Sequence, residues 1–316
     1  RAICAGPGNP PVVVDETDRR LLALFHELVD KERYYVERAY ELIEEAGLRP
    51  QPPTFAIKDS NFNFLRPVKL AEHASEQIAG EIERLSALKG RVAPGDALYA
   101  GDMRQYLRVA YSGLRCVNLS LAAAGAGEPG SILDLPCGHG RVMRVLRLAF
   151  PAAEIWGADF DRSAVDFCAS HFDATPIQAA PDPAAIAIHR SFDLIWCGSL
   201  LTQLDASRSM EFLAFLQSRL NPAGVAVFTT HGEAPVRWLE VGHFDYGLDP
   251  ARAAKALAEY RSSGFGWTEH PRGGGVSLAS PAWMIDAIAR IGGWRLAAFF
   301  PRAWDGHHDV WACVRD

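Results

Sequence analysis

The sequence has no pair of cysteines at the close spacing that zinc sites and redox motifs use. Its six cysteines are scattered through 316 residues, which favours a reduced setting over a disulfide framework. No apolar run approaches the roughly 18 residues of a membrane-spanning helix, and the first residues show no basic-then-apolar signal pattern. We therefore expect a cytoplasmic protein with no membrane partner and no zinc finger.

Runs of lysine and arginine are missing as well. The chain carries 32 basic and 38 acidic residues, a formal net charge of −6, and no basic stripe that would follow a nucleic-acid backbone. Hydrophobic residues make up 49% of the chain, enough to bury a large core. These properties indicate a globular protein whose partner is not a nucleic acid.

The stretch around which the chain is organised is SILDLPCGHGRVMRVLR, residues 131–147. Ser131 to Leu135 is the short apolar run of a strand buried in a parallel sheet. Gly138-His139-Gly140 lets the backbone approach a ligand closely, and the apolar residues between Arg141 and Phe150 predict a helix. A ligand can therefore sit over the amino terminus of that helix.

A second predicted strand, Glu154 to Ala158, ends at Asp159 and Phe160. Asp159 follows Gly138 by about 20 residues, the offset at which an acid that binds ribose hydroxyls follows a glycine turn. A nucleoside is implied, and both NAD and S-adenosylmethionine contain one. The dinucleotide fingerprint needs a small residue where this chain has Met143, so NAD is disfavoured.

The segment ILDLPCGHG resembles motif I of the class I S-adenosylmethionine-dependent methyltransferases. GADFDRSAVDFC is similar to their motif II, FDLIWCGSLLTQLD to their fourth strand and the helix after it, and LNPAGVAVFTTHG to their fifth strand. The resemblance covers residues 101–316. It implies a Rossmann-like, seven-stranded α/β sheet with a C-terminal antiparallel hairpin, and S-adenosylmethionine as the cofactor. Pro136 departs from the motif, since the family usually has its first glycine there, and it should stiffen the turn.

The carboxyl ends of the strands generate the predicted cofactor site. The resemblance implies that Asp134 helps to hold the ammonium group of the cofactor. A cation at a helix start is mildly unfavourable, a cost that makes sense if Arg141 meets the methionine carboxylate; the alternative is that Arg141, Arg144 and Arg147 form a solvated face. The full predicted set is Asp134, Pro136, Gly138, His139, Gly140, Arg141, Asp159, Phe160, Gly198 and Ser199.

The stretch WRLAAFFPRAWDGHHDVWACVR, residues 294–315, predicts two strands whose connection, PRAWDGHH, lies on the cofactor rim according to the resemblance. His231 and His308 are the predicted catalytic bases, because imidazole can take the proton of an acceptor hydroxyl; the alternative is that each stabilises a turn. No metal site is expected, since neighbouring strand residues such as His307, His308 and Asp309 point to opposite faces.

Aromatic and histidine side chains supply the predicted acceptor contacts. Segment 233–279 is longer than a simple crossover, and its aromatic residues suggest a pocket for an apolar or ring-bearing acceptor; the alternative is a hydrophobic cluster under a long loop. Tyrosines before the first strand are candidate lid residues, although packing suits them better. The predicted substrate residues are Tyr106, His231, Trp267, Trp304 and His307.

Two domains are expected, an N-terminal helical extension of residues 1–100 and the methyltransferase domain of residues 101–316. The extension contains two predicted helices, Arg19 to Ala46 and Val68 to Leu88, which would cap the substrate, form a homodimer or cover a sheet edge. A further helix is predicted from Pro281 to Ile291, with Gly292 as its stop.

The sequence predicts transfer of a methyl group to a small-molecule acceptor. The main hypothesis is an O-methyltransferase of a bacterial secondary metabolite or sugar. Carbon or nitrogen methylation, or a non-catalytic interaction protein that keeps the fold, are the alternatives. Aminopropyl transfer is disfavoured, because no acidic cluster follows the fourth strand to hold a polyamine.

Overall fold

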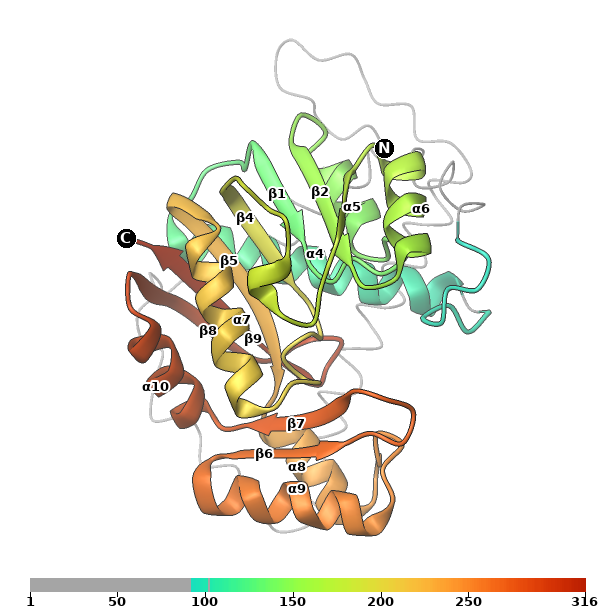
Figure 1. Ribbon diagram of the computed structural model, residues 1–316, viewed down its shortest axis with the longest axis vertical. Helices are drawn as coiled ribbons and strands as arrows, with labels where there is room; N and C mark the ends of the chain where they lie inside the picture. Colours follow the sequence, from blue (N-terminus) through green and yellow to red (C-terminus); the bar gives the residue numbers. More distant parts are fainter. Residues whose placement is uncertain (1–91, 102) are drawn as a thin grey trace, which may run out of the picture. The chain divides into compact units, whose positions relative to one another are not determined.

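The computed structural model describes residues 92–101 and 103–316 (Figure 1). The chain divides into two units, Arg1–Lys89 and Gly90–Asp316, and the second holds every described element. The predicted helices Arg19 to Ala46 and Val68 to Leu88 lie outside the described residues, so the role of the N-terminal extension stays a prediction.

A seven-stranded sheet organises this unit, in the order β3-β2-β1-β4-β5-β9-β8. Strands β1 to β5 run parallel, whereas β9 lies antiparallel between β5 and β8. The predicted Rossmann-like sheet with its C-terminal antiparallel hairpin is confirmed. The strands are β1 (Ser131–Asp134), β2 (Glu154–Asp159), β3 (Thr175–Gln178), β4 (Phe192–Cys197), β5 (Leu220–His231), β8 (Trp294–Trp304) and β9 (His308–Arg315).

Helices lie on both faces of the sheet, with α4 behind it and α7 and α10 in front in Figure 1. Side-chain caps fix several helix starts, because the oxygen of an Asp or Ser satisfies a free backbone N–H: Asp161 begins α6, Asp205 begins α7 and Ser280 begins α10. No helix among the described residues is long and apolar enough to cross a membrane. The bounds are α4 (Met103–Ala124), α5 (Met143–Ala149), α6 (Arg162–Phe172), the 3-10 helix η1 (Pro183–Ala185), α7 (Ala206–Ser218) and α10 (Pro281–Ile291).

The predicted insertion after β5 has secondary structure of its own. It contains α8 (Glu233–Val241), α9 (Pro250–Ser263) and the antiparallel pair β6 (Phe265–Glu269) and β7 (Gly275–Ala279), drawn in orange in Figure 1. A small core of Val236, Ala256, Leu257 and Leu278 holds the helices on the pair. The segment is therefore not one long loop but an ordered layer with a small hydrophobic cluster of its own, and the predicted acceptor pocket stays a prediction.

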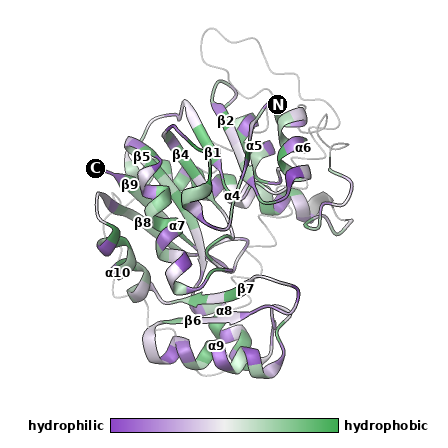
Figure 2. Cartoon of the chain, viewed as in Figure 1, coloured by the Kyte–Doolittle hydropathy of each residue, from purple (hydrophilic) through white to green (hydrophobic). Residues whose placement is uncertain are grey.

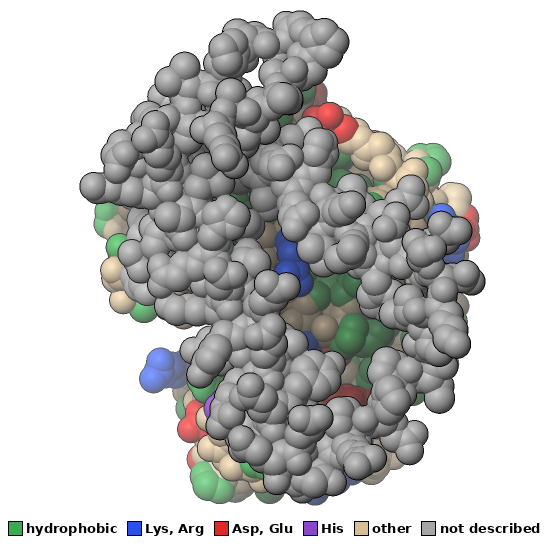
Figure 3. All heavy atoms as spheres, turned by 180° about the vertical axis from the view of Figure 1, so that it is seen from behind, with side chains coloured by type: hydrophobic (Ala, Val, Ile, Leu, Met, Phe, Trp, Pro, Cys, Tyr) green, Lys and Arg blue, Asp and Glu red, His purple; other side chains and the backbone are tan. Residues whose placement is uncertain are grey.

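The main core lies between the central strands and the helices. Trp196, Phe228 and Trp311 are fully buried there, and the indole of Trp311 donates to the hydroxyl of Thr230. Figure 2 shows hydrophobic residues concentrated on the central strands, whereas α9 alternates between hydrophobic and hydrophilic residues. Where described residues are visible from behind, basic and acidic side chains stand at separate places rather than in one patch (Figure 3). The buried central strands place their carboxyl ends at one edge, where loops are free to vary.

Some predicted boundaries shift. Helix α5 begins at Met143 rather than Arg141, because Gly140 is left-handed (φ 78°) and the chain continues in a turn. The predicted connection 301–308 is mostly strand: β8 continues to Trp304, and only residues 305–307 turn. The helix predicted from Pro281 to Ile291 is confirmed, with Gly292 at its end.

Candidate active site

The loop between β1 and α5 brings backbone to the carboxyl edge of the sheet. Gly138 (φ 49°) and Gly140 (φ 78°) both adopt the left-handed conformation that glycine tolerates best. A Cβ atom at Gly140 would lie 2.4 Å from the Phe172 ring of α6, so only glycine fits this position. The bond between Leu135 and Pro136 is cis. The loop therefore packs tightly on α6 while Gly138 and His139 stay half-exposed.

Asp134, the last residue of β1, is a buried acid without a hydrogen-bonded partner among the described residues. Its side chain is 1% exposed, and neither carboxylate oxygen has a hydrogen-bond partner among the described residues. Burial, with a smaller contribution from the charge of Asp159, raises the pKa of Asp134 well above its usual range. An unpaired buried carboxylate is costly, so this position is complementary to a cationic group.

Arg141, at the other end of the same loop, carries the opposite charge to an aspartate and also has a buried polar atom. Its Nε atom is buried and lacks a hydrogen-bond partner in the described part of the chain, and burial lowers its pKa. The guanidinium lies 5.9 Å from the Tyr106 ring centroid, and its charge also acts on His308. One loop thus offers a buried carboxyl group and a half-buried guanidinium, each able to take a partner of opposite charge.

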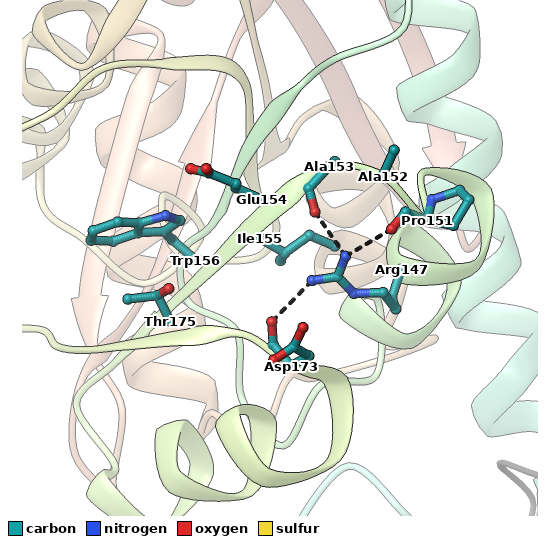
Figure 4. Close-up of a pocket in the computed structure, with 9 residues that line it drawn as sticks. All are labelled: Arg147, Pro151, Ala152, Ala153, Glu154, Ile155, Trp156, Asp173 and Thr175. Atoms are coloured by element: carbon teal, nitrogen blue, oxygen red, sulfur yellow. Dashed lines mark hydrogen bonds between the residues drawn. The ribbon is translucent and has the colours of Figure 1, made fainter.

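The alternative of a solvated arginine face is wrong. Arg144 is fully buried: its Nε donates to the carbonyl of Gly140 at 3.2 Å, and its guanidinium packs over the rings of Tyr106 and Phe172. Arg147 donates to the main-chain carbonyls of Ala153 and Asp173 at 2.7 and 3.0 Å (Figure 4) and to that of Phe172 at 2.9 Å.

The pocket in Figure 4 lies at the amino-terminal ends of β2 and β3, the sheet edge opposite to the glycine loop. Because main-chain carbonyls already occupy the guanidinium of Arg147, this arginine braces the start of β2. The pocket is therefore not the place where the predicted cofactor residues meet.

Asp159 ends β2 beside the glycine loop. Its Oδ2 accepts from the N–H of Gly138 at 2.8 Å and its Oδ1 from the N–H of Asp161 at 2.9 Å. Each carboxylate oxygen keeps a second lone pair, and the side chain is half-buried. The neighbouring Phe160 is 44% exposed, unusual for a phenylalanine, and Gln178 donates to its carbonyl. An acid and an exposed ring thus stand side by side.

The end of β4 turns sharply at Gly198 and Ser199. Ser199 is left-handed (φ 65°), and its N–H donates to the hydroxyl of Thr229 on β5 at 2.8 Å. That hydroxyl also lies 3.2 Å from Nδ1 of His308. The β4 turn is therefore joined to the histidine region through one threonine.

Three histidines meet where β5 and β9 pair. His231 lies opposite His308 in the register of the two strands, and one ring nitrogen from each of His231, His307 and His308 lies within 4.8 Å of the others. The expectation that His307 and His308 point apart is wrong, because His307 belongs to the turn before β9 rather than to the strand. Asp309 is not part of the group; its Oδ1 accepts from the N–H of Arg302.

Burial keeps these imidazoles neutral. His231 and His308 are each 6% exposed; burial lowers the pKa of His231 to about 3 and that of His308 well below its usual range, and it also lowers the pKa of the half-buried His307. An imidazole that resists protonation is a poor proton acceptor. The predicted role of His231 and His308 as general bases is therefore disfavoured.

The strand order and the loop chemistry agree with the comparison to protein families. Residues 133–226 match a family model described as a methyltransferase domain. The match spans β1 to β5, so it includes the glycine loop and Asp159, and it supports the predicted resemblance to class I S-adenosylmethionine-dependent methyltransferases. No curated protein matches the chain.

Several solved structures are similar to this chain in fold. An S-adenosylmethionine-dependent methyltransferase from Clostridium acetobutylicum has 12% identity and a TM-score of 0.47, covering 74% of this chain and 98% of its own. DesVI from Streptomyces venezuelae has 14% identity and a TM-score of 0.48, over 70% and 96% of the two chains. The magnesium protoporphyrin IX methyltransferase of Synechocystis has 14% identity and a TM-score of 0.46, over 69% and 91%.

Two of the predicted acceptor residues, Tyr106 and Trp304, are buried and hydrogen-bonded within the protein. Tyr106 is 2% exposed and its hydroxyl donates to Asp96 at 2.6 Å. Trp304 is 4% exposed, and its indole N–H donates to the carbonyl of Val109, which fastens β8 to α4. The polar atoms of both side chains are thus already hydrogen-bonded within the protein.

Trp267, the third predicted aromatic contact, lies on β6. Its indole donates to the carbonyl of Gln203, which follows β4, so it joins the insertion to the sheet. The residue that sequence reasoning missed is Tyr246: its ring centroid lies 4.7 Å from that of His231, and its hydroxyl is buried without a hydrogen-bond partner in the described structure. The aromatic composition of segment 233–279 was the available signal, but it did not distinguish this tyrosine.

Proposed function

We propose that the protein transfers a methyl group from S-adenosylmethionine to an oxygen atom of a small-molecule acceptor. The observation that carries this proposal is the pairing of Asp134 and Arg141 on one loop. A buried carboxylate and a buried guanidinium nitrogen, both without hydrogen-bond partners among the described residues, complement the ammonium and carboxylate groups of a methionine moiety. Asp134 would hold the first and Arg141 the second.

The other predicted cofactor residues fit the nucleoside part of the same ligand. The spare lone pairs of Asp159 would accept from the two ribose hydroxyls, and the exposed ring of Phe160 would stack on the adenine. Pro136, Gly138, His139 and Gly140 would let the loop follow the ligand closely, and Gly198 and Ser199 would border it from β4. When bound, S-adenosylmethionine supplies a methyl group that its sulfonium already activates.

The acceptor side depends on alignment rather than on strong acid–base chemistry. With the methyl group activated, the chain mainly has to orient the acceptor oxygen and exclude water. His231 and His307 would face the acceptor beside an aromatic wall: ring centroids of Tyr246 and His231 are 4.7 Å apart, and those of Trp238 and His307 are 5.7 Å apart. Such a wall suits a ring-bearing acceptor.

A bacterial secondary metabolite or a sugar is the acceptor class that we propose. Oxygen is preferred to nitrogen or carbon because neutral imidazoles offer lone pairs that can accept from a hydroxyl. A cytoplasmic location and a homodimer formed through residues 1–100 belong to the same proposal.

Calorimetric titration of the full chain with S-adenosylmethionine, and separately with NAD, tests the cofactor. We expect a dissociation constant in the micromolar range, about −8 kcal/mol, for S-adenosylmethionine alone. Asp159→Ala should weaken binding by about 1 to 3 kcal/mol, because hydrogen bonds to the ribose are lost. Asp166→Ala is the matched control, since Asp166 is an exposed acid of α6 paired with Arg162.

Failure of S-adenosylmethionine to bind would overturn the proposal and favour a non-catalytic interaction protein. Once binding is established, candidate acceptors are screened by the mass gain of one methyl group. Fragmentation of the product then separates oxygen from nitrogen or carbon methylation.

A further inference from the structure

The three histidines form a group that methyl transfer by itself does not require. They come from β5 (His231), from the turn before β9 (His307) and from the first residue of β9 (His308), yet one ring nitrogen of each lies within 4.8 Å of the other two. Two of them are 6% exposed. Three imidazoles that bring a nitrogen this close together can share one ligand, because each neutral ring offers one lone pair.

Hydrogen bonds fix which nitrogen each imidazole turns to the group. Nδ1 of His231 lies 3.2 Å from the carbonyl of Ser277, and Nδ1 of His307 lies 3.2 Å from the carbonyl of Asp305. A carbonyl can only accept, so in both residues Nδ1 carries the proton and Nε2 has the free lone pair. The main chain has thus set the tautomer of two histidines.

His308 can adopt the same tautomer. Its Nδ1 lies 3.2 Å from the hydroxyl of Thr229, whose oxygen also accepts from the N–H of Ser199 at 2.8 Å. A hydroxyl oxygen has two lone pairs, so it can accept from both donors. All three Nδ1 atoms can therefore donate to an oxygen on the side of the ring away from the group. Histidines in metal sites commonly donate their second N–H in this way.

The surroundings of the three imidazoles add a hydroxyl oxygen and several aromatic rings, while the charges of Arg141 and Asp305 act on His308 and His307 from the neighbouring loops. Tyr246, whose ring lies 4.7 Å from that of His231, has a buried hydroxyl without a hydrogen-bond partner among the residues that the structure describes. The rings of Trp304 and Trp238 lie 4.9 Å and 5.7 Å from those of His308 and His307. Three neutral nitrogen ligands, an adjacent oxygen and an aromatic shell favour a cation at the centre.

We propose that His231, His307 and His308 bind a divalent transition metal ion of the Zn²⁺ class through their Nε2 atoms. Imidazole nitrogen is a preferred ligand of Zn²⁺, and three protein ligands leave a fourth position open. The acceptor oxygen or a water molecule would take that position. Metal binding itself is independent of methyl transfer; only the placement of the ion beside the acceptor rests on the proposed function.

The geometry requires a small adjustment. Zn–N bonds of about 2.0 to 2.1 Å in a tetrahedral site place ligand nitrogens about 3.3 Å apart, so nitrogens at up to 4.8 Å must approach one another. His307 has the most freedom to do so, because it is half-buried and belongs to a turn. His231 and His308 are held by paired strands and would define the site.

The test is metal binding by the purified full chain after chelator treatment. Zn²⁺ is titrated against a chelating indicator, and Co²⁺ is added separately because its visible absorption reports nitrogen ligation and coordination number. We expect one Zn²⁺ per chain, a Co²⁺ spectrum of a four- or five-coordinate site, and a higher unfolding temperature in the presence of Zn²⁺.

His307→Ala is the main variant, since the turn position makes misfolding the smallest concern, and the exposed His189→Ala is its matched control. His307→Ala should lower Zn²⁺ affinity by at least the roughly 10- to 100-fold that loss of a supporting hydrogen bond causes, and Thr229→Val should fall in that range. His189→Ala should bind as the unchanged protein does.

Equal Zn²⁺ affinity in the unchanged protein and His307→Ala, or no binding by a chain that still unfolds cooperatively, would overturn the metal site. Titration with S-adenosylmethionine on the same samples keeps the two proposals apart. A chain that binds the cofactor but no metal refutes the metal site alone, whereas a chain that binds metal but no cofactor refutes the methyl-transfer proposal alone.

Discussion

The two halves of the candidate site are built in different ways. The cofactor half is a continuous piece of chain, β1 to the end of β2, in which Asp134, Gly138, Gly140 and Asp159 follow one another within residues 131–160. The acceptor half brings together residues from β5, the insertion and the last hairpin, up to 77 positions apart in the His231–His308 pair. Spacing along the chain therefore encodes the first half, whereas sheet topology creates the second.

The halves also differ in charge. The glycine loop holds Asp134, whose two carboxylate oxygens lack hydrogen-bond partners among the described residues, and Arg141, whose Nε lacks one, so it is suited to a zwitterionic ligand. The histidine group is kept neutral by burial and receives its order from the carbonyls of Ser277 and Asp305. Changes in the first half should accordingly alter cofactor binding, and changes in the second should alter acceptor or metal chemistry at constant cofactor affinity.

The largest effect is expected in the glycine loop, from Gly140→Ala. A left-handed backbone costs an ordinary residue roughly 1 to 2 kcal/mol, and a Cβ atom 2.4 Å from the Phe172 ring adds an overpacking cost of about 1 to 3 kcal/mol. We expect chemical unfolding to show a loss of about 2 to 5 kcal/mol, with weaker cofactor binding.

Gly125→Ala is the matched control for this change. Gly125 is also left-handed (φ 68°), but a Cβ atom there would meet nothing within 4 Å. It should lose only the roughly 1 to 2 kcal/mol of the backbone term. Equal losses in the two variants would show that the contact between the loop and α6 does not constrain the site.

Asp134→Asn tests the charge of the cofactor half. In the free protein the pKa of Asp134 is raised, so the group stays protonated as the pH rises above the usual value of about 3.9. A bound ammonium would favour the carboxylate, so cofactor binding should release a proton at pH values below the raised pKa and should tighten as the pH rises through it. Calorimetry in buffers of different ionisation enthalpy measures that proton.

The variant should release no proton and should bind about 1.5 to 3 kcal/mol more weakly, the usual value of a hydrogen bond to a charged group. Before ligand is added, the sign for stability is opposite: a raised folded pKa stabilises the fold below pH 3.9 or so, and that contribution is lost as the pH rises through the folded pKa. The same proton release in Asp134→Asn would assign the proton to another group.

These differences explain which parts the sequence could predict. The sheet, the glycine turn and the end of α10 at Gly292 depend on local signals, namely apolar runs, glycine spacing and caps, and each was predicted close to its observed position. Arg144 was misplaced, because a charged residue on a helix is read as exposed unless its ring partners Tyr106 and Phe172 are known.

The acceptor half could not be read in the same way. His231 and His308 were candidates, but their meeting with His307 depends on the β5–β9 register and on a turn that begins only after Trp304. No sequence pattern distinguished Tyr246. Its ring position depends on its own left-handed backbone (φ 55°) in the connection between α8 and α9. Both are results of tertiary packing rather than of local propensity.

The smallest change in stability should come from Tyr246→Phe, which tests whether the acceptor half is built for a ligand or for packing. The variant removes a buried hydroxyl without a hydrogen-bond partner in the described structure, so the free energy of unfolding should stay constant or rise by about 1 kcal/mol, because the desolvation cost of the hydroxyl disappears.

Cofactor affinity should be unchanged by Tyr246→Phe, whereas methylation of an identified acceptor should slow by about 10-fold, the equivalent of one hydrogen bond of about 1.4 kcal/mol. Tyr260→Phe is the control, since Tyr260 packs on the small core of α8 and α9. A clear loss of stability in Tyr246→Phe would mean that the hydroxyl already has a structural partner. The Tyr246 hydroxyl would then serve packing alone, and neither an acceptor nor a ligand of the three histidines would contact it.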